Sequence, residues 1–251
     1  MTGRISQLSD RALYLAAGLN VADTTRLARW LYRFGTAPRS GEIERNFGYG
    51  DDAMAVMGLT PGGAARQILE VHFEATTFPG WLSFTRESAP IAGQAACKLY
   101  VSPQPAELAA VFPAIADVFA RLNVPSFKVG RGIEGLLRPD KVVAYFDDRD
   151  ALNRVAKALG KRLANCAAQP VPFTAEAGGD GLLSWGTDPP LGSGGLSWRA
   201  WIARQLAEGL TRARPATNSE AVAAALRHVT AQGVECATWT IERFLPATAT
   251  T

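Results

Sequence analysis

The stretch QAACKLYVSP, residues 94–103, decides the predicted fold because its side chains alternate in character. Leu99 and Val101 fall on one face of an extended chain, and Lys98 and Tyr100 fall on the other. This alternation predicts a half-buried β-strand. The simplest interpretation of its polar face is a lysine in water with a tyrosine packed beside it. A polar face that binds a ligand is the alternative, and the neighbouring segments bear on the choice.

The segments that follow this strand predict a sheet with helices on one side. Apolar residues at helical spacing predict an amphipathic helix at 105–124, which contains Pro113. The segments 125–130 and 141–146 alternate as strands do, and 147–165 has the pattern of a second amphipathic helix. This order indicates an α+β fold in which a mixed or antiparallel sheet carries flanking helices.

Both ends of the chain are predicted to be largely helical. Cap-like residues and closing glycines predict helices at 9–19, 22–35, 196–210 and 217–233, with Ser197 as one N-cap. The remaining predicted features are a hairpin within 68–84, a long Gly- and Pro-rich loop at 168–195, and a last strand at 234–245. We expect a single domain, 1–251, with a helical N-terminal annex (1–65) and an α+β core (66–251).

The bulk composition narrows the possible chemistry. A length of 251 residues is enough for a full core, and the apolar content of 47% is usual for a globular protein. The net charge of +3 is too small to imply nucleic-acid binding, although it suits an anionic substrate. No cysteine or histidine spacing matches a metal site, so we expect no metal and no cofactor. With no signal peptide and no membrane-spanning run, we expect a cytoplasmic protein.

Several cations lie on predicted strands or at a helix start, next to loops rich in glycine and proline. Taken singly, each has a simple interpretation, because strand lysines and early helical arginines usually face water. Together they suggest an anion site, because a helix N-terminus offers free N–H groups and arginine offers a bidentate fork for phosphate. These cations are Lys98, Lys128, Arg138, Lys141 and Arg199.

The order of these short motifs resembles a known family. The segments KLY, FKVG, LLRPDKVVAYF, PFT and SWRAWIA follow one another as in the lyase fold of phosphothreonine lyase effectors. They are closer still to the effector-Hop-A-like family found beside kinases in lanthipeptide and thioamitide biosynthesis, and LARWLYRFGTAP resembles that family's opening segment. The motif-dense part runs from Lys98 to Arg199. The resemblance implies β-elimination of phosphate from phosphoserine or phosphothreonine in a precursor peptide, giving dehydroalanine or dehydrobutyrine.

The resemblance also implies roles for individual residues. Lys128 matches the lysine that removes the α-proton, and Lys98 matches a phosphate-binding lysine. Tyr100 stands where the effectors carry a histidine that acts as general acid, so the acid role falls to a different residue type. The resemblance assigns the remaining phosphate contacts to three residues, Arg138, Lys141 and Arg199.

These roles are chemically consistent with one another. A peptide α-proton is a very weak acid, whereas a free lysine with a pKa of about 10.4 is almost fully protonated at neutral pH. Burial of Lys128 beside other cations would lower its pKa and so provide a neutral amine. The same cations would neutralise the phosphate and the developing enolate.

A second interpretation is a lyase-like subunit without activity, which binds a phosphopeptide or leader peptide or activates a partner kinase. The tyrosine in place of histidine favours it. A host-targeted effector is disfavoured because the N-terminus is not a Ser-rich secretion segment, and a kinase is disfavoured because no glycine-rich loop, HRD or DFG triplet is present. Desolvation of Lys128 beside Lys98 and Arg138 would favour the enzyme over the inactive subunit.

Overall fold

The structure of the chain is a computed structural model. It describes residues 3–19, 21–47, 52–87, 89, 97–190, 192–213 and 216–241. Residues 94–96 of the opening stretch and 242–245 of the predicted last strand lie outside the described residues. None of the described helices is long and apolar enough to cross a membrane.

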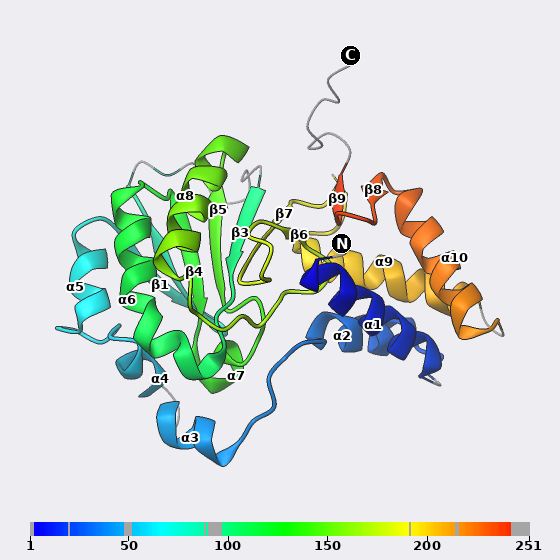
Figure 1. Cartoon of the computed structure of the whole chain (residues 1–251), viewed down its shortest axis with the longest axis horizontal. Helices are drawn as coiled ribbons and strands as arrows, with labels where there is room; N and C mark the ends of the chain where they lie inside the picture. The colour runs from blue at the N-terminus through cyan, green and yellow to red at the C-terminus, as the bar shows by residue number, and fades with distance from the viewer. Residues whose placement is uncertain are drawn as a thin grey trace. The chain divides into compact units, whose positions relative to one another are not determined.

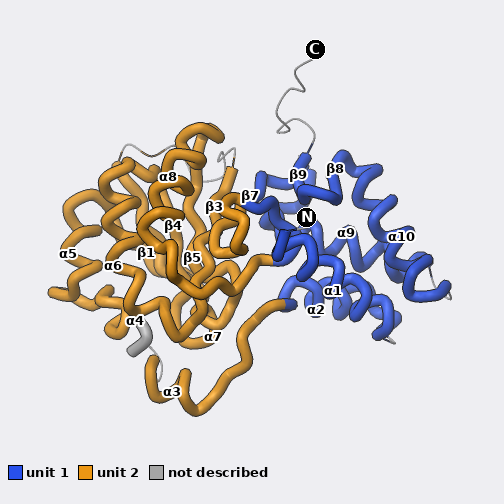
Figure 2. The backbone as a smooth tube through the Cα atoms, viewed as in Figure 1, with its two compact units in different colours: residues 1–34, 172–176, 186–251 blue, residues 35–171, 177–185 orange. Residues whose placement is uncertain are grey.

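The chain divides into two compact units (Figure 2). Unit 1 comprises residues 1–34, 172–176 and 186–251, and unit 2 comprises residues 35–171 and 177–185. These boundaries differ from the predicted division at residue 65. The physical reason is that the first and last helices of the chain share one apolar core, whereas the helices within residues 35–65 pack with other helices of unit 2.

The described part of unit 1 is built mainly from four helices, three of which begin at a side-chain cap (Figure 1). They are α1 (Arg4–Gly18), α2 (Thr24–Arg33), α9 (Trp198–Arg212) and α10 (Asn218–Thr230), and α9 packs against both α2 and α10. Asp23 and Ser197 cap α2 and α9, and Thr217 forms a capping box with Glu220. The three predicted helices that these residues begin are therefore confirmed.

Two predicted elements of unit 1 are corrected by the structure. Helix α1 begins at Arg4 rather than at Ser9, because the Ser9 hydroxyl is buried inside the helix. That hydroxyl donates to the Ile5 carbonyl (2.8 Å) and accepts from the Phe173 amide (2.9 Å). The predicted last strand is a pair of short antiparallel strands, β8 (Val234–Glu235) and β9 (Thr240–Ile241).

Unit 2 contains the helices of the chain's middle and most of its strands. The helices are α3 (Gly41–Phe47), α4 (Asp52–Val56), α5 (Ala64–Glu70), α6 (Pro105–Arg121), α7 (Gly132–Leu136) and α8 (Arg149–Arg162). The strands are β1 (Glu74–Phe78), β2 (Trp81–Thr85), β3 (Cys97–Val101), β4 (Ser126–Gly130), β5 (Val142–Phe146) and the first part of β7 (Leu183–Thr187). The predicted hairpin, which turns at Pro79-Gly80, is β1 and β2.

The described strands form a seven-stranded sheet in the order β1-β2-β4-β5-β3-β7-β6, where β6 is Ala175–Glu176. The pairs β1/β2, β2/β4, β4/β5 and β3/β5 are all antiparallel. The predicted α+β fold with an antiparallel sheet and flanking helices is confirmed. The predicted loop at 168–195 is wrong in part, because β7 is a fully buried strand within it.

The two faces of the sheet differ sharply in unit 2. On one face, Phe127 of β4 stacks on Phe84 of β2 (4.8 Å between ring centres) and meets Phe119 of α6 (4.9 Å). Helices α6 and α8 lie over this apolar face (Figure 1). The residues that alternate with Phe127 and Phe84 therefore point to the opposite face, where the cations of β3 and β4 lie.

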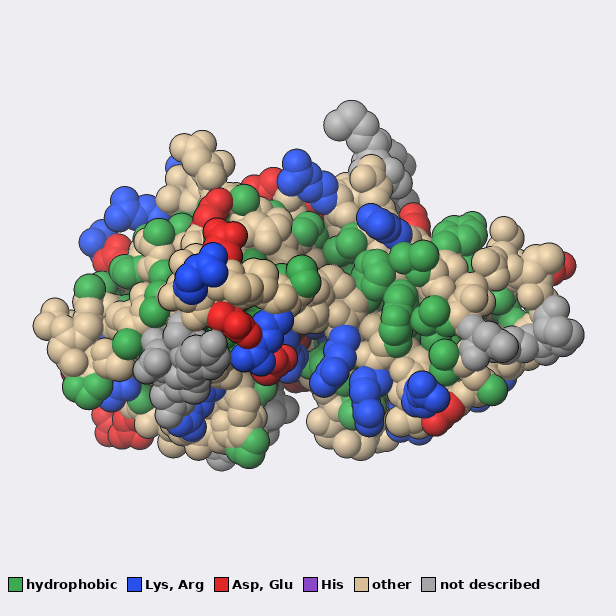
Figure 3. Space-filling model, turned by 90° about the horizontal axis from the view of Figure 1, so that it is seen from below, with side chains coloured by type: hydrophobic (Ala, Val, Ile, Leu, Met, Phe, Trp, Pro, Cys, Tyr) green, Lys and Arg blue, Asp and Glu red, His purple; other side chains and the backbone are tan. Residues whose placement is uncertain are grey.

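The surface has no large region of one charge on the face shown in Figure 3. There, Lys and Arg side chains lie beside Asp and Glu side chains, as expected for a net charge of only +3. A net charge this small gives little long-range attraction for an anion, so local arrangements of cations matter more for anion recognition.

Candidate active site

The strand register places the predicted base and its neighbours on one face of the sheet. Lys98 of β3 lies opposite Tyr145 of β5, and Lys128 of β4 lies opposite Val143. Tyr100 also lies opposite Val143, from the other side. Because directly paired residues of antiparallel strands point to the same side, all five side chains share the face that α6 and α8 do not cover.

Aromatic rings cover the two lysines. The Lys128 Nζ atom lies 4.2 Å from the centre of the Trp81 ring and 5.7 Å from that of Tyr145. The Lys98 Nζ atom lies 5.7 Å from the same Tyr145 ring. Arg138 reaches the Trp81 ring as well, with its Cζ atom 4.9 Å from the ring centre. Two rings thus hold three cations in one cluster, which we call the cation cluster: Lys98, Lys128 and Arg138.

Burial gives Lys128 an altered acidity. The pKa of Lys128 is lowered to about 8, and loss of hydration is the largest cause. The carboxylate of Asp140 opposes the change, whereas the positive charges of Lys98 and Arg138 contribute to it. At pH 7 the neutral amine then makes up about a tenth of the molecules, several hundred times more than for an ordinary lysine. Lys128 is the residue of this face with the electrostatics of a base.

Arg138 is held in place by a carboxylate. Its Nε and Nη2 atoms donate to the two carboxylate oxygens of Asp140, each at 2.9 Å, so the ion pair is bidentate. Asp140 is buried, whereas about a quarter of the Arg138 side chain remains exposed. The ion pair therefore fixes the orientation of a side chain that is still accessible to a ligand.

The turn that carries Arg138 is fixed by a close approach of two glycines. A Cβ atom on Gly135 would lie 2.7 Å from the Gly130 carbonyl carbon, and a Cβ atom on Gly130 would meet the Gly135 carbonyl. The end of β4 therefore packs directly, backbone to backbone, on α7. This contact positions the Arg138–Asp140 pair relative to Lys128.

Lys141 does not lie where its predicted role as a phosphate contact would place it. The side chain is fully buried, and its Nζ atom donates to the Pro103 carbonyl (2.7 Å) and to Gln169 Oε1 (2.6 Å). Gln169 in turn donates to the carbonyls of Gly35 (2.7 Å) and Leu137 (2.9 Å). Burial lowers the pKa of Lys141 to about 7. With 0% exposure, this lysine joins segments inside unit 2 and does not present its amine at the surface.

Tyr100 is also more buried than a residue of a half-exposed strand would be. It is 3% exposed and packs with Val143 and Val171, and Trp81 and Tyr145 flank the same cluster. All five residues of β3 are buried, and the strand lies between β5 and β7 in the sheet. The predicted strand is confirmed, and its predicted half-exposure is wrong.

Arg199 belongs to unit 1, whereas the cation cluster belongs to unit 2. It is 2% exposed, and its Nη2 atom donates to the Tyr32 carbonyl at 2.8 Å. The guanidinium also lies over the Tyr32 ring, with Cζ 4.9 Å from the centre. Within unit 1, therefore, Arg199 joins α9 to α2.

Sequence reasoning missed three residues that shape this site. They are Trp81, Asp140 and Tyr145, none of which has a role in the sequence prediction. A usable signal was the pattern Trp81-Leu-Ser-Phe, because Trp81 and Ser83 alternate with the core residue Phe84. Among the described residues, no group of His, Cys, Asp or Glu could hold a metal ion.

Comparison with known proteins identifies relatives in fold. No protein-family model matches the chain, and no curated protein matches its sequence. An effector protein from Pseudomonas syringae pathovar tomato is 10% identical with a TM-score of 0.58, over 95% of this chain and 98% of that chain. An effector protein from pathovar syringae is 11% identical with a TM-score of 0.56, over 95% and 99%. At these identities the similarity shows a shared fold and nothing about activity.

A more distant similarity reaches an enzyme. The phosphothreonine lyase SpvC, an effector protein from Salmonella, is 14% identical with a TM-score of 0.38, over 74% of this chain and 91% of that chain. That score is too low to support a conclusion about this chain, so the chemistry has to be inferred from the cation cluster itself.

Proposed function

We propose that this protein is a lyase that removes phosphate from phosphoserine or phosphothreonine in a peptide, without a metal ion. The observation that carries the proposal is Lys128, whose pKa is lowered to about 8 beside Lys98 and Arg138. A lysine that loses its proton near neutral pH can act as a base, and cations next to it suit a substrate that carries a phosphate dianion.

The proposed reaction is a β-elimination. The neutral amine of Lys128 takes the α-proton, the electrons of the Cα–H bond form the Cα=Cβ double bond, and the Cβ–O bond breaks to release inorganic phosphate. Lys98 and Arg138 bind the phosphate and stabilise the negative charge that develops on the peptide carbonyl. Tyr100, two residues from Lys98 on the same strand face, is the candidate donor of a proton to the leaving group.

Lys141 and Arg199 have different roles in this proposal. Lys141 supports the segment that precedes β5 through its buried hydrogen bonds, and so acts on the site by positioning it. Arg199 remains a candidate phosphate ligand from the sequence resemblance alone. The proposed substrate is a precursor peptide with a leader, phosphorylated by a partner kinase, and its products carry dehydroalanine or dehydrobutyrine.

The test is incubation of the purified protein with a phosphoserine peptide, followed by mass spectrometry. Elimination removes phosphoric acid, whereas hydrolysis returns serine, and the two products differ by the mass of one water. Addition of a thiol provides a second readout, because only dehydroalanine reacts with it. Two results would contradict the proposal. One is that every phosphorylated peptide offered keeps its phosphate, and the other is that the product contains serine.

One observation favours a second candidate function. Tyr100 is packed in an apolar cluster. It stands at the position where the resemblance places a histidine that acts as general acid. A protein without the acid could bind a phosphopeptide through the cation cluster and release it unchanged. Phosphopeptide binding that is lost in the Lys98→Ala variant, with no change of peptide mass in the wild type, is the result that this alternative predicts.

A further inference from the structure

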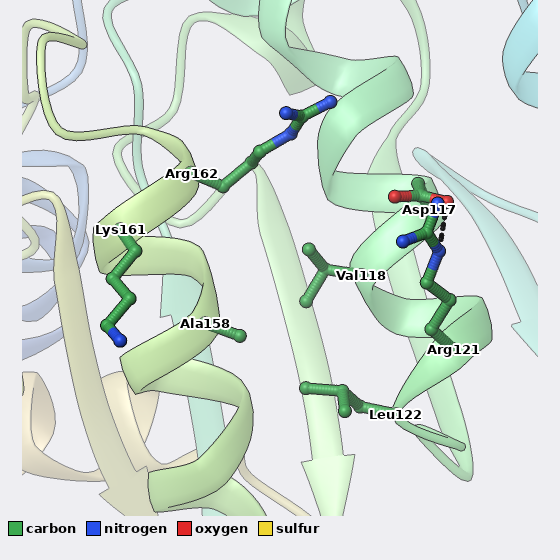
Figure 4. Close-up of a pocket in the computed structure, with 7 residues that line it drawn as sticks. All are labelled: Asp117, Val118, Arg121, Leu122, Ala158, Lys161 and Arg162. Carbon is green, nitrogen blue, oxygen red and sulfur yellow. Dashed lines mark ion pairs between the residues drawn. The ribbon is translucent and has the colours of Figure 1, made fainter.

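A groove lies between helices α6 and α8 of unit 2, on the helix-covered side of the sheet (Figure 4). Its volume is about 510 Å³, which is within the range of pockets that bind ligands. Figure 4 shows Val118 and Leu122 pointing from α6 toward α8, and Ala158 pointing back from α8. These three side chains form an apolar floor, which includes a leucine that is 42% exposed.

The rim of the groove is basic. Arg121 comes from α6 and Lys161 and Arg162 come from α8, and the one acidic lining residue is Asp117. Asp117 forms an ion pair with Arg121 (2.8 Å). Figure 4 shows the Arg162 side chain extending toward α6 at one end of the groove, beyond Val118. The lining residues therefore carry a formal charge of +2, next to apolar surface.

Stabilisation of the helix ends explains only part of this arrangement. All three cations lie in the last turn of their helices, where positive charge interacts favourably with the helix dipole. That effect requires neither an exposed leucine nor a hollow between the helices. A basic rim around an apolar floor is instead the arrangement that complements an acidic chain with apolar anchors.

We propose that the groove between α6 and α8 binds an acidic polypeptide segment that carries one or more large apolar side chains. The apolar side chain occupies the floor at Val118, Leu122 and Ala158, and flanking carboxylates meet Lys161 and Arg162. A nucleic acid is a poorer match, because its phosphates would use the rim and leave the floor in water. The groove and the cation cluster lie on opposite sides of the sheet, so this binding does not depend on the proposed lyase reaction.

The binding test uses a fluorescein-labelled synthetic peptide in which single leucines alternate with pairs of glutamates, measured by fluorescence anisotropy. Two control peptides replace all glutamates by glutamine or all leucines by serine. We expect the acidic leucine peptide to bind at low ionic strength and to lose affinity as salt is added. Each control peptide should bind at least fivefold more weakly.

Variants of α8 separate the groove from general electrostatic attraction. Lys161→Gln with Arg162→Gln should weaken binding of the acidic peptide at least fivefold. Arg154→Gln with Lys157→Gln removes the same charge from exposed positions of the same helix outside the groove, and should weaken it less than twofold. Leu122→Ser removes the exposed part of the floor. Its affinity for the acidic leucine peptide should be as low as that of the wild type for the serine control peptide.

Several outcomes would overturn the proposal. One is equal loss of binding in the two double variants, since attraction would then be to the helix as a whole. Another is a wild type that does not bind the acidic leucine peptide, when unfolding midpoints show that the wild type and every variant are folded. A third is binding to vesicles of phosphatidylcholine and phosphatidylserine that requires Lys161 and Arg162 while the peptide does not bind, which would assign the groove to lipid headgroups.

Discussion

The Nζ atom of Lys128 lies 4.2 Å from the centre of the Trp81 indole ring. This contact has two opposite effects on the lysine. The face of the ring attracts the ammonium form, whereas the volume of the ring excludes water and disfavours charge. Burial is the largest cause of the lowered Lys128 pKa, so we expect exclusion of water to be the stronger of the two effects of the ring.

Removal of Trp81 should therefore raise the Lys128 pKa. If Lys128 is the base, kcat/KM for a phosphoserine peptide rises with pH as the amine loses its proton, with an apparent pKa near 8 in the wild type. In Trp81→Ala this rise should move to higher pH, because water then reaches the amine. Trp81→Phe keeps a ring in place and is the matched control, with a smaller shift. A shift to lower pH in Trp81→Ala would show that the attraction of the ring for the ammonium dominates.

Loss of the Lys128 amine should affect turnover much more than binding. We expect Lys128→Ala to lower the elimination rate by at least about 10²–10⁴-fold, the usual worth of a general base. Phosphopeptide affinity should change little, because Lys98 and Arg138 remain. Lys98→Ala provides the contrast: it should weaken binding and turnover together, since a phosphate contact acts in both the ground state and the transition state. Equal effects of the two variants on binding would argue against these separate roles.

The hydroxyl of Tyr100 can be tested with its packing kept intact. Tyr100→Phe preserves the ring that contacts Val143 and Val171, so the unfolding midpoint should stay near that of the wild type. If the hydroxyl protonates the leaving phosphate, the rate should fall by about 10²–10⁴-fold. A loss below about threefold would instead match one neutral hydrogen bond of roughly 0.5–1.5 kcal/mol. Rates measured with substrates of different leaving-group acidity distinguish the two roles.

Lys141 should contribute to stability, and the contribution should depend on pH. Lys141→Met leaves the Pro103 carbonyl and Gln169 Oε1 without their donor, and we expect a loss of about 1–3 kcal/mol in the free energy of unfolding. Because the pKa of Lys141 in the folded state is lowered to about 7 from the ordinary lysine value of 10.5, the amine keeps its proton between these values mainly in the unfolded state. The stability gap between wild type and variant should therefore widen from pH 7 to pH 9 in urea unfolding. A gap that stays constant from pH 7 to pH 9 would mean that the buried amine keeps its proton in the folded state.

The sequence predicts the strands of the site better than their burial. Alternation of polar and apolar residues is a local property, so it is enough to predict that Lys98 and Tyr100 share a face and that Lys128 alternates with Phe127. It does not predict that β3 lies in the interior of the sheet, which depends on β7. That strand was missed because the glycines and prolines around it indicate a loop.

The surroundings of Lys128 depend on contacts that sequence patterns do not contain. Trp81 reaches Lys128 only because β2 pairs with β4, with Ser83 opposite Lys128. Lys141 is enclosed because its amine forms a hydrogen bond with Gln169, which comes from a distant segment of the chain. A basic residue next to a strand has the same local pattern whether it faces a ligand or the interior, so the sequence alone could not separate Lys141 from Lys128.

The backbone contact between Gly130 and Gly135 limits how natural selection can reshape this protein. Neither glycine has room for a side chain, so the chain that leads to Arg138 cannot be repositioned by gradual substitution at these two positions. A change of substrate preference has to arise among the surrounding rings, such as Trp81 and Tyr145, which are partly exposed. Descendants of this sequence can therefore diversify the walls around the cations more readily than the spacing between them.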